Sequence, residues 1–244
     1  VLDAKRGIVE YRKLGLTEDQ YYLLDLMLAR PEGIILVTGP TGSGKTTTLY
    51  SVLSHMNDES VNIMTLEDPV EYPITRIRQT SISDGSKIDF SDGVRSLMRQ
   101  DPDIILVGEV RDKDTAEMAF RAAMTGHQVF STLHTNSALR SFQRIKDLGV
   151  SPEVMAGNII GIVAQRLVRR VCVHCREEVQ VTEGSIEARL IGAHAVGRTV
   201  YRAHHGGCEA CGFQGYKGRL AIMELLRMDS MLDELITRNA TLGE

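Results

Sequence analysis

No stretch of the 244-residue sequence approaches the ~18 consecutive apolar residues that a membrane-spanning helix requires. The best candidate, IIGIVAQRLVRR at residues 159–170, is interrupted by Arg166. The opening residues also lack the charged and apolar regions of a secretory signal peptide. The sequence therefore contains no recognisable signal for membrane insertion or export.

An excess of positive charge is missing as well. The chain has 28 Lys and Arg residues against 32 Asp and Glu residues, a net charge of −4. This balance argues against a general nucleic-acid-binding protein, although it leaves a local basic patch possible. With 43% hydrophobic and 25% charged residues, the composition is that of a globular protein, long enough for one large domain with an appendage.

The segment GPTGSGKTTTLY at residues 39–50 follows the apolar run GIILVTG and precedes a helical pattern. Its spacing is that of a P-loop, in the strand–loop–helix context that this motif needs. Glycines let the backbone N–H groups and the helix N-terminus converge on phosphate, while Lys45 reaches the β- and γ-phosphates and the Thr46 hydroxyl binds Mg²⁺. We therefore expect a nucleoside triphosphate as ligand. The predicted binding residues are Gly39, Pro40, Thr41, Gly42, Ser43, Gly44, Lys45, Thr46 and Thr47.

Strand-like and helix-like patterns alternate along the chain. The strand signals fall at residues 33–39, 62–68, 103–110, 127–134 and 219–226. Helical spacing places Phe90, Val94, Leu97 and Met98 on one face, and Leu139, Phe142, Ile145 and Leu148 on another that ends at Gly149. This alternation predicts an α/β fold with a mostly parallel sheet and helices on both faces.

Polar side chains follow several of these strands. The second strand runs out into Glu67, Asp68 and Glu71, the third ends in Glu109, and the fourth starts near His127 and ends at His134. A single strand-end glutamate is more often a helix cap or a surface charge. Three such strand ends beside a P-loop instead favour a hydrolytic site, because ligands of parallel sheets bind at the carboxyl ends of strands.

Glu109 is the candidate general base. In IILVGE, Gly108 occupies the position where the usual second motif of P-loop nucleoside triphosphatases carries aspartate. Alternation along a strand would turn Glu109 away from the phosphates. This constraint relaxes near a strand end, so we expect Glu109 to face the phosphates, with metal contact left to Thr46 and water.

Four segments together carry a family resemblance: GPTGSGKTTTLY, LEDPVEY, RQDPDIILVGEVRD and TGHQVFSTLHTNSA, in this order. They resemble the Walker A, Asp box, Walker B and His box motifs of the ATPases that drive type II secretion and type IV pilus assembly, and AQRLVRRVC extends the match to Cys172. The resemblance implies a RecA-like core, ATP hydrolysis, a homohexameric ring and a cytoplasmic location. It places Glu67 in the Asp box, makes Glu109 the Walker B carboxylate, and puts His127 and His134 in the His box, where His134 senses the γ-phosphate.

The resemblance also implies an organisation into domains and partners. In this family a preceding domain supplies arginines to the nucleotide, and the chain starts at Val1 without a methionine. We therefore expect residues 1–20 to be a linker from that domain, residues 21–171 the ATPase core, 172–211 a metal-binding subdomain and 212–244 the end of the ATPase domain. The expected partner is an inner-membrane platform protein, through which the motor associates peripherally with the membrane, and no direct contact with nucleic acid is expected.

The four cysteines form two pairs, Cys172-x-x-Cys175 and Cys208-x-x-Cys211. This spacing is typical of a structural Zn²⁺ site, in which four thiolates fill the tetrahedron and leave no position for water. Disulfides are the competing explanation, but a cytosolic chain would keep them reduced. Assembly and secretion ATPases of the family commonly carry such a tetracysteine loop, whereas retraction motors typically lack it. The nearby His174, His204 and His205 are expected to be solvated rather than ligands.

Two other functions remain open from the sequence. A thymidine kinase also combines a P-loop core with a four-cysteine zinc lasso, but it leaves the Asp box and His box unexplained. A zinc-bearing nucleic-acid module with structural ATP finds its best support in RLVRR at residues 166–170, although such a run is usually a solvated surface.

Overall fold

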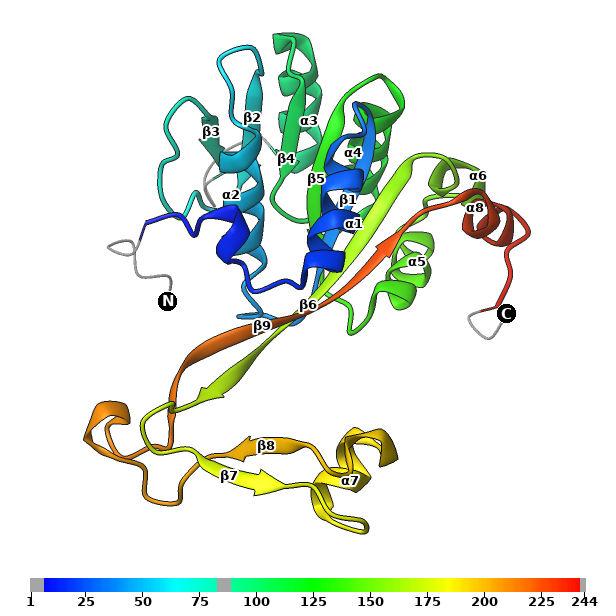
Figure 1. The fold of residues 1–244 in the computed structure, drawn as a ribbon. Helices are drawn as coiled ribbons and strands as arrows, with labels where there is room; N and C mark the ends of the chain where they lie inside the picture. Colours follow the sequence, from blue (N-terminus) through cyan, green and yellow to red (C-terminus); the bar gives the residue numbers. More distant parts are fainter. Residues whose placement is uncertain (1–6, 83–88, 242–244) are drawn as a thin grey trace. The chain divides into compact units, whose positions relative to one another are not determined.

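The structure is a computed structural model that describes residues 7–82 and 89–241 (Figure 1). The chain divides into two compact units. One comprises Val1–Arg166 and Ala221–Glu244 and is called the core unit here; the other, Leu167–Leu220, is called the cysteine unit. These bounds differ from the predicted subdomain at 172–211, because the long strands that enter and leave the cysteine unit extend past the cysteines on both sides.

One seven-stranded sheet has the order β3-β2-β4-β5-β1-β6-β9. Its strands are β1 (Gly33–Thr38), β2 (Ile63–Glu67), β3 (Arg78–Ser81), β4 (Ile104–Val107), β5 (Gln128–Leu133), β6 (Ile159–Val171) and β9 (Tyr216–Arg227). All pairings from β3 to β6 are parallel. β9 returns antiparallel along β6, since Met228 N–H donates to the Ile160 carbonyl and Cys172 N–H to that of Gly215.

Helices cover both faces of this sheet in the core unit (Figure 1). They are α1 (Glu18–Leu28), α2 (Lys45–Met56), α3 (Phe90–Leu97), α4 (Lys113–Met124), α5 (Ala138–Asp147), α6 (Pro152–Met155) and α8 (Ser230–Thr237). Along β1, Ile34 and Leu36 pack into the cluster that contains α3, α4 and α5, and Ile35 and Val37 into the cluster that contains α1 and α2. A strand buried on both sides has no polar face, which is why β1 reads as a continuous apolar run.

The predicted fold class is confirmed, and each predicted strand corresponds to an observed one. Two strands lie outside the predicted ones: β3, which is short and polar, and β6, most of which is formed by IIGIVAQRLVRR. The predicted helix over Leu139–Leu148 is observed as α5, and Gly149 follows it with a φ of 87°. Leu139, however, is exposed and does not belong to the buried face.

The described part of the predicted linker packs on the core. Tyr11 is buried, its hydroxyl donates to Asp25 of α1 at 2.7 Å, and its ring stacks on His55 of α2 at a centroid distance of 4.2 Å. Leu14 is buried beside it. Residues 7–20 therefore form part of the core unit, while residues 1–6 lie outside the described residues.

The cysteine unit contains a small antiparallel pair, β7 (Glu177–Gln180) and β8 (Thr199–Arg202), joined through α7 (Ile186–Ile191). The segment EARLIGAHAVGR, unassigned from its sequence, supplies α7. Across the residues that the structure describes, no helix is long and apolar enough to cross a bilayer.

Candidate nucleotide and metal sites

The P-loop joins β1 to α2 and contains three glycines with positive φ: 148° at Gly39, 77° at Gly42 and 91° at Gly44. L-residues with a side chain rarely adopt these angles, so the loop geometry depends on glycine. At Gly39 space is restricted too, because a Cβ there would lie 2.3 Å from the Gln165 carbonyl oxygen. α2 begins at Lys45 with Gly44 as its N-cap, and its first N–H groups are available to an anion.

Lys45 and Ser43 have the chemistry that a phosphate chain requires. Lys45 Nζ donates to the carbonyls of Gly39 at 2.9 Å and Pro40 at 3.3 Å. Burial lowers the pKa of Lys45, and the nearby Glu109 carboxylate partly opposes this shift. The Ser43 hydroxyl is buried and has no hydrogen-bond partner among the described residues. A polyanion at the loop fits both groups, since it would neutralise the partly desolvated ammonium and accept from the hydroxyl.

Glu109 is the centre of a charged cluster at the carboxyl ends of β4 and β5. One of its oxygens lies 2.9 Å from Arg111 Nε and the other 3.0 Å from His134 Nε2. Arg111 also reaches Asp68 at 3.6 Å. β4 ends at Val107, so strand alternation does not govern Glu109, two residues later. β4, β5 and β1 are neighbouring parallel strands, so their carboxyl ends place this cluster at the same sheet edge as the P-loop.

Glu67 lies at the same sheet edge, but its carboxylate is buried and occupied by donors. Tyr50 of α2 donates to one oxygen, and Thr65 and Gln79 donate to the other at 2.5 and 3.3 Å. Burial and, next, the hydrogen bond to Glu67 raise the pKa of Tyr50, so its hydroxyl remains a donor throughout the working pH range. This geometry suits a positioning group better than a base, because Glu67 is only 4% exposed and water has little access to its carboxylate.

His127 is not brought to this edge. It precedes β5, and its ring nitrogen Nδ1 contacts the Ala122 carbonyl at 3.0 Å. His134 follows the other end of that strand, and the six residues between them separate the two histidines by roughly 20 Å. Of these two histidines, His134 is the one that joins the Glu109 cluster.

Two polar connections that were not predicted from the sequence support the site. The Thr38 hydroxyl, at the end of β1, accepts from Thr135 N–H and bonds the Thr135 hydroxyl, both at 2.8 Å, and Thr135 contacts Ser141 at 2.8 Å. These hydrogen bonds connect the start of the P-loop to the segment after His134. The second connection is Gln165, whose amide is buried within β6. Its sequence signal is a polar residue directly after the apolar run IIGIVA, because a polar side chain that is buried with such a run requires hydrogen-bond partners.

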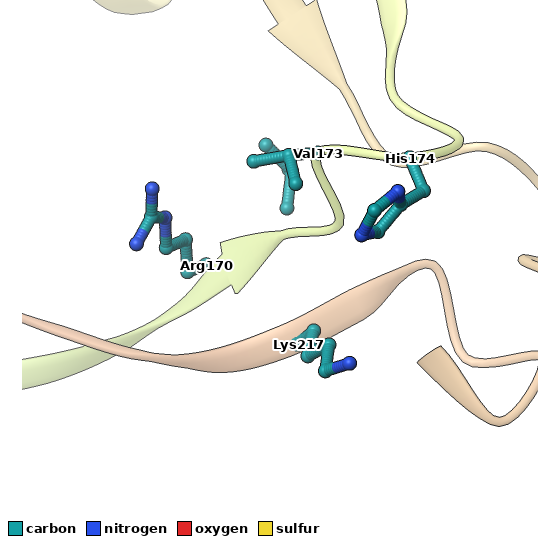
Figure 2. Close-up of a pocket in the computed structure, with 5 residues that line it drawn as sticks. Arg170, Val173, His174 and Lys217 are labelled. Atoms are coloured by element: carbon teal, nitrogen blue, oxygen red, sulfur yellow. The ribbon is translucent and has the colours of Figure 1, made fainter. Parts of the chain in front are cut away.

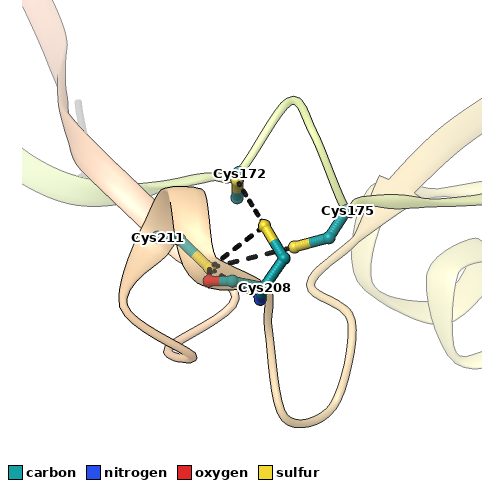
Figure 3. Close-up of side chains that lie close together, drawn as sticks. All are labelled: Cys172, Cys175, Cys208 and Cys211. Atoms are coloured by element: carbon teal, nitrogen blue, oxygen red, sulfur yellow. Dashed lines mark hydrogen bonds between the residues drawn. The ribbon is translucent and has the colours of Figure 1, made fainter.

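The four predicted zinc ligands converge in the cysteine unit (Figure 3). Their Sγ atoms all lie within 4.8 Å of one another. Three of the Sγ pairs are 3.9 Å apart: Cys172 with Cys208, Cys175 with Cys211, and Cys208 with Cys211. A tetrahedron with Zn–S bonds of about 2.3 Å separates its sulfurs by about 3.8 Å, so the set fits zinc and is too widely spaced for disulfides.

Backbone donors surround one of these sulfurs. The N–H groups of Cys208 and Gly215 each donate to Cys211 Sγ at 3.2 Å, and they lower the pKa of the Cys211 thiol to about 6. A thiolate stabilised in this way is a prepared metal ligand. A pocket lined by Arg170, Val171, Val173, His174 and Lys217 lies next to the Cys172–Cys175 turn (Figure 2). His174 faces it from an exposed position and is not in the ligand cluster.

Comparison with known families shows which family this chain belongs to. Residues 1–244 match the family described as Type II/IV secretion system protein. The chain belongs to this family. Two similar relatives are the Type II secretion system protein E of Dickeya dadantii (strain 3937), 47% identical over 229 residues, and the Type IV pilus assembly ATPase TfpB of Acinetobacter baylyi (strain ATCC 33305 / BD413 / ADP1), 44% identical over 244 residues.

These alignments cover 94% and 100% of this chain but only 45% and 42% of the two relatives. The chain described here thus spans less than half the length of these two relatives. Among solved structures, the pilus retraction motor PilT with bound ADP superposes with a TM-score of 0.70 at 33% identity, covering 96% of this chain and 57% of PilT. The Legionella pneumophila ATPase DotB, at 24% identity and a TM-score of 0.67 over 94% of this chain and 56% of its own, shares the fold.

Proposed function

We propose that this chain is the ATP-hydrolysing region of a motor that powers type IV pilus assembly or type II secretion. The observation that supports this most directly is the approach of Lys45 on the P-loop, Glu109 after β4 and His134 after β5 to one edge of the sheet. Phosphate binding, a general base and a γ-phosphate contact are the three groups that nucleotide hydrolysis requires there. The resemblance to secretion and pilus ATPases supports the same reading.

In this proposal the residues divide the work by position. The P-loop N–H groups and Lys45 hold the β- and γ-phosphates, and the Thr46 hydroxyl is the protein ligand for Mg²⁺, which neutralises phosphate charge when bound. Glu109 accepts a proton from the attacking water. His134 donates toward the γ-phosphate, and Glu67 holds the end of β2 in place through its hydrogen bonds to Tyr50 and Gln79.

We further propose that the motor works as a homohexamer at the cytoplasmic face of the inner membrane. A domain preceding this segment would supply arginines to the nucleotide, and contact with the membrane would pass through a platform protein. The four cysteines would hold one Zn²⁺ whose role is structural, because all four ligands come from the protein and no position remains for a reacting water.

Phosphate release from ATP tests the proposal against its alternatives. We expect the chain to release phosphate with ATP and Mg²⁺ alone, without need of thymidine or DNA, and we expect Lys45→Ala to lose this activity while keeping its fold. Formation of thymidine phosphate would instead indicate a kinase. Turnover that required DNA would indicate a nucleic-acid-dependent enzyme.

A further inference from the structure

Gln165 lies on β6 beside the P-loop and is only 3% exposed. Its side-chain amide bridges two parts of the phosphate-binding segment. Nε2 donates to the Ser43 carbonyl at 2.8 Å, and Oε1 accepts from the Thr48 hydroxyl on α2 at 2.7 Å. The backbone of Gln165 restricts the loop as well, because its carbonyl oxygen occupies the space that a Cβ at Gly39 would need.

The bond to Ser43 determines how one peptide of the loop is oriented. In a planar trans peptide the C=O and the N–H point in opposite directions, and the Ser43 carbonyl shares its plane with the Gly44 N–H. Holding the carbonyl toward Gln165 therefore turns the Gly44 N–H away from β6. Gly44 itself could adopt other geometries without steric cost, since it has no Cβ and has a φ of 91°.

The Ser43 carbonyl determines which way the amide of Gln165 faces, because a carbonyl oxygen can only accept and therefore meets the NH₂ group. The Thr48 hydroxyl, which can donate or accept, donates to Oε1 and holds the other end of the amide. The reversed amide would place two acceptor oxygens against each other in a buried site. The Ser43 carbonyl thus fixes the orientation of the amide, and the bond from Thr48 holds the side chain in place.

We infer that Gln165 is a positioning residue for phosphate binding, which holds the Ser43–Gly44 peptide with its N–H directed at the phosphate chain. It acts through the loop and does not touch the nucleotide. The inference rests on the proposed function, since it presupposes that the P-loop binds the phosphates. It predicts that losing the amide weakens nucleotide binding more than it changes the chemical step.

The test compares nucleotide affinity with catalytic rate in Gln165→Met, which keeps the side-chain length and removes both hydrogen bonds. We expect the Kd for a fluorescent ADP and the KM for ATP to rise roughly tenfold, and kcat to change less than about threefold. Gln165→Glu should weaken binding further, because it places an acceptor against the Ser43 carbonyl.

Gln128→Met is the matched control. Gln128 is also 3% exposed and donates to two backbone carbonyls, those of Leu28 at 3.0 Å and Arg30 at 2.7 Å. It lies at the start of β5, at the edge of the sheet opposite the P-loop. This variant should lose a similar amount of thermal stability and bind ADP with the affinity of the parent.

Three outcomes would overturn the inference: unchanged ADP affinity in Gln165→Met, an equal loss of affinity in Gln128→Met, or an intact parent that binds no ADP. Only the last also contradicts the proposed function. If Gln165→Met does not fold, Gln165→Glu provides the test, because it keeps the shape of the side chain and replaces the donor that meets the Ser43 carbonyl. An unchanged Kd in Gln165→Glu would then reject the inference.

Discussion

His134 Nε2 lies 3.0 Å from Glu109 Oε1, which joins the segments that follow β5 and β4 at one edge of the sheet. Arg111 holds the other oxygen of Glu109 at 2.9 Å. The Glu109 side chain is 18% exposed, so water can reach it, whereas its two partners restrict where it points. A carboxylate that is both accessible and oriented has the properties of a general base.

Glu109→Gln should bind ATP and Mg²⁺ but hydrolyse ATP about 10²- to 10⁴-fold more slowly, which is the typical contribution of a general base. Single-turnover phosphate release measures the loss. Glu117→Gln, which neutralises an exposed glutamate on α4, is the control and should retain the parent rate. Parent-like activity in Glu109→Gln would make Glu67 the base.

Tyr50→Phe should destabilise the protein by about 1–3 kcal/mol, because it leaves a buried oxygen of Glu67 without its donor. Urea unfolding of the parent and the variant measures this difference. Tyr72, whose ring meets that of Tyr50 edge-on at 4.8 Å, is the control: Tyr72→Phe removes a hydroxyl and leaves the Tyr50–Glu67 bond in place. Equal losses in both variants would argue against a special role for this bond.

Lys45→Met should increase the free energy of unfolding at neutral pH in the absence of nucleotide. Burial lowers the pKa of Lys45 in the folded protein, so the folded state binds this proton less tightly than the unfolded chain and the charged ammonium costs stability. The cost is fully present below the lowered pKa and disappears as the pH rises through it toward the ordinary value for lysine.

Unfolding of Lys45→Met and the parent at neutral and strongly alkaline pH tests this sign. The stability advantage of the variant should shrink as the pH rises. Addition of ADP and Mg²⁺ should raise the Tm of the parent and leave that of the variant unchanged, because the ligand stabilises only the protein that binds it. A variant less stable than the parent at neutral pH would contradict the prediction.

The purified chain should contain about one zinc per molecule, and Cys208→Ser should lower this content sharply. Because binding of the metal contributes to local folding, its removal should increase hydrogen exchange within residues 167–220. ADP affinity should not change, since the P-loop belongs to the core unit, which has its own hydrophobic clusters. Absence of metal, or four titratable thiols in the native protein, would reject the zinc site.

The chain should be a weak ATPase when it is dilute. An arginine contributed from another domain or subunit can be worth about 10³- to 10⁵-fold in such reactions. We therefore expect the specific activity to rise with protein concentration and to be far higher in a longer form that includes the proposed preceding domain. High activity that is independent of concentration would show that the site is complete within this segment.

The sequence by itself determined the fold class and predicted the chemistry of both candidate sites. β1 is almost entirely apolar because both of its faces are buried, and such a run between helical patterns implies a parallel sheet. β5 is also buried along its length, although it contains Gln128, Ser131 and Thr132. The P-loop glycines and the cysteine pairs could be interpreted locally, because each depends on backbone geometry or ligand spacing within a few residues.

Only the tertiary structure decided which of the polar residues act together. Glu67 and Glu109 are equivalent as strand-end glutamates in the sequence, yet one is buried among Tyr50, Thr65 and Gln79 and the other is accessible beside His134. Gln165 meets Ser43, 122 residues earlier in the chain, only because β6 pairs with β1. Hydrogen bonds depend on distances of about 3 Å, and in a chain of this length sheet pairing sets those distances between segments that no local pattern connects.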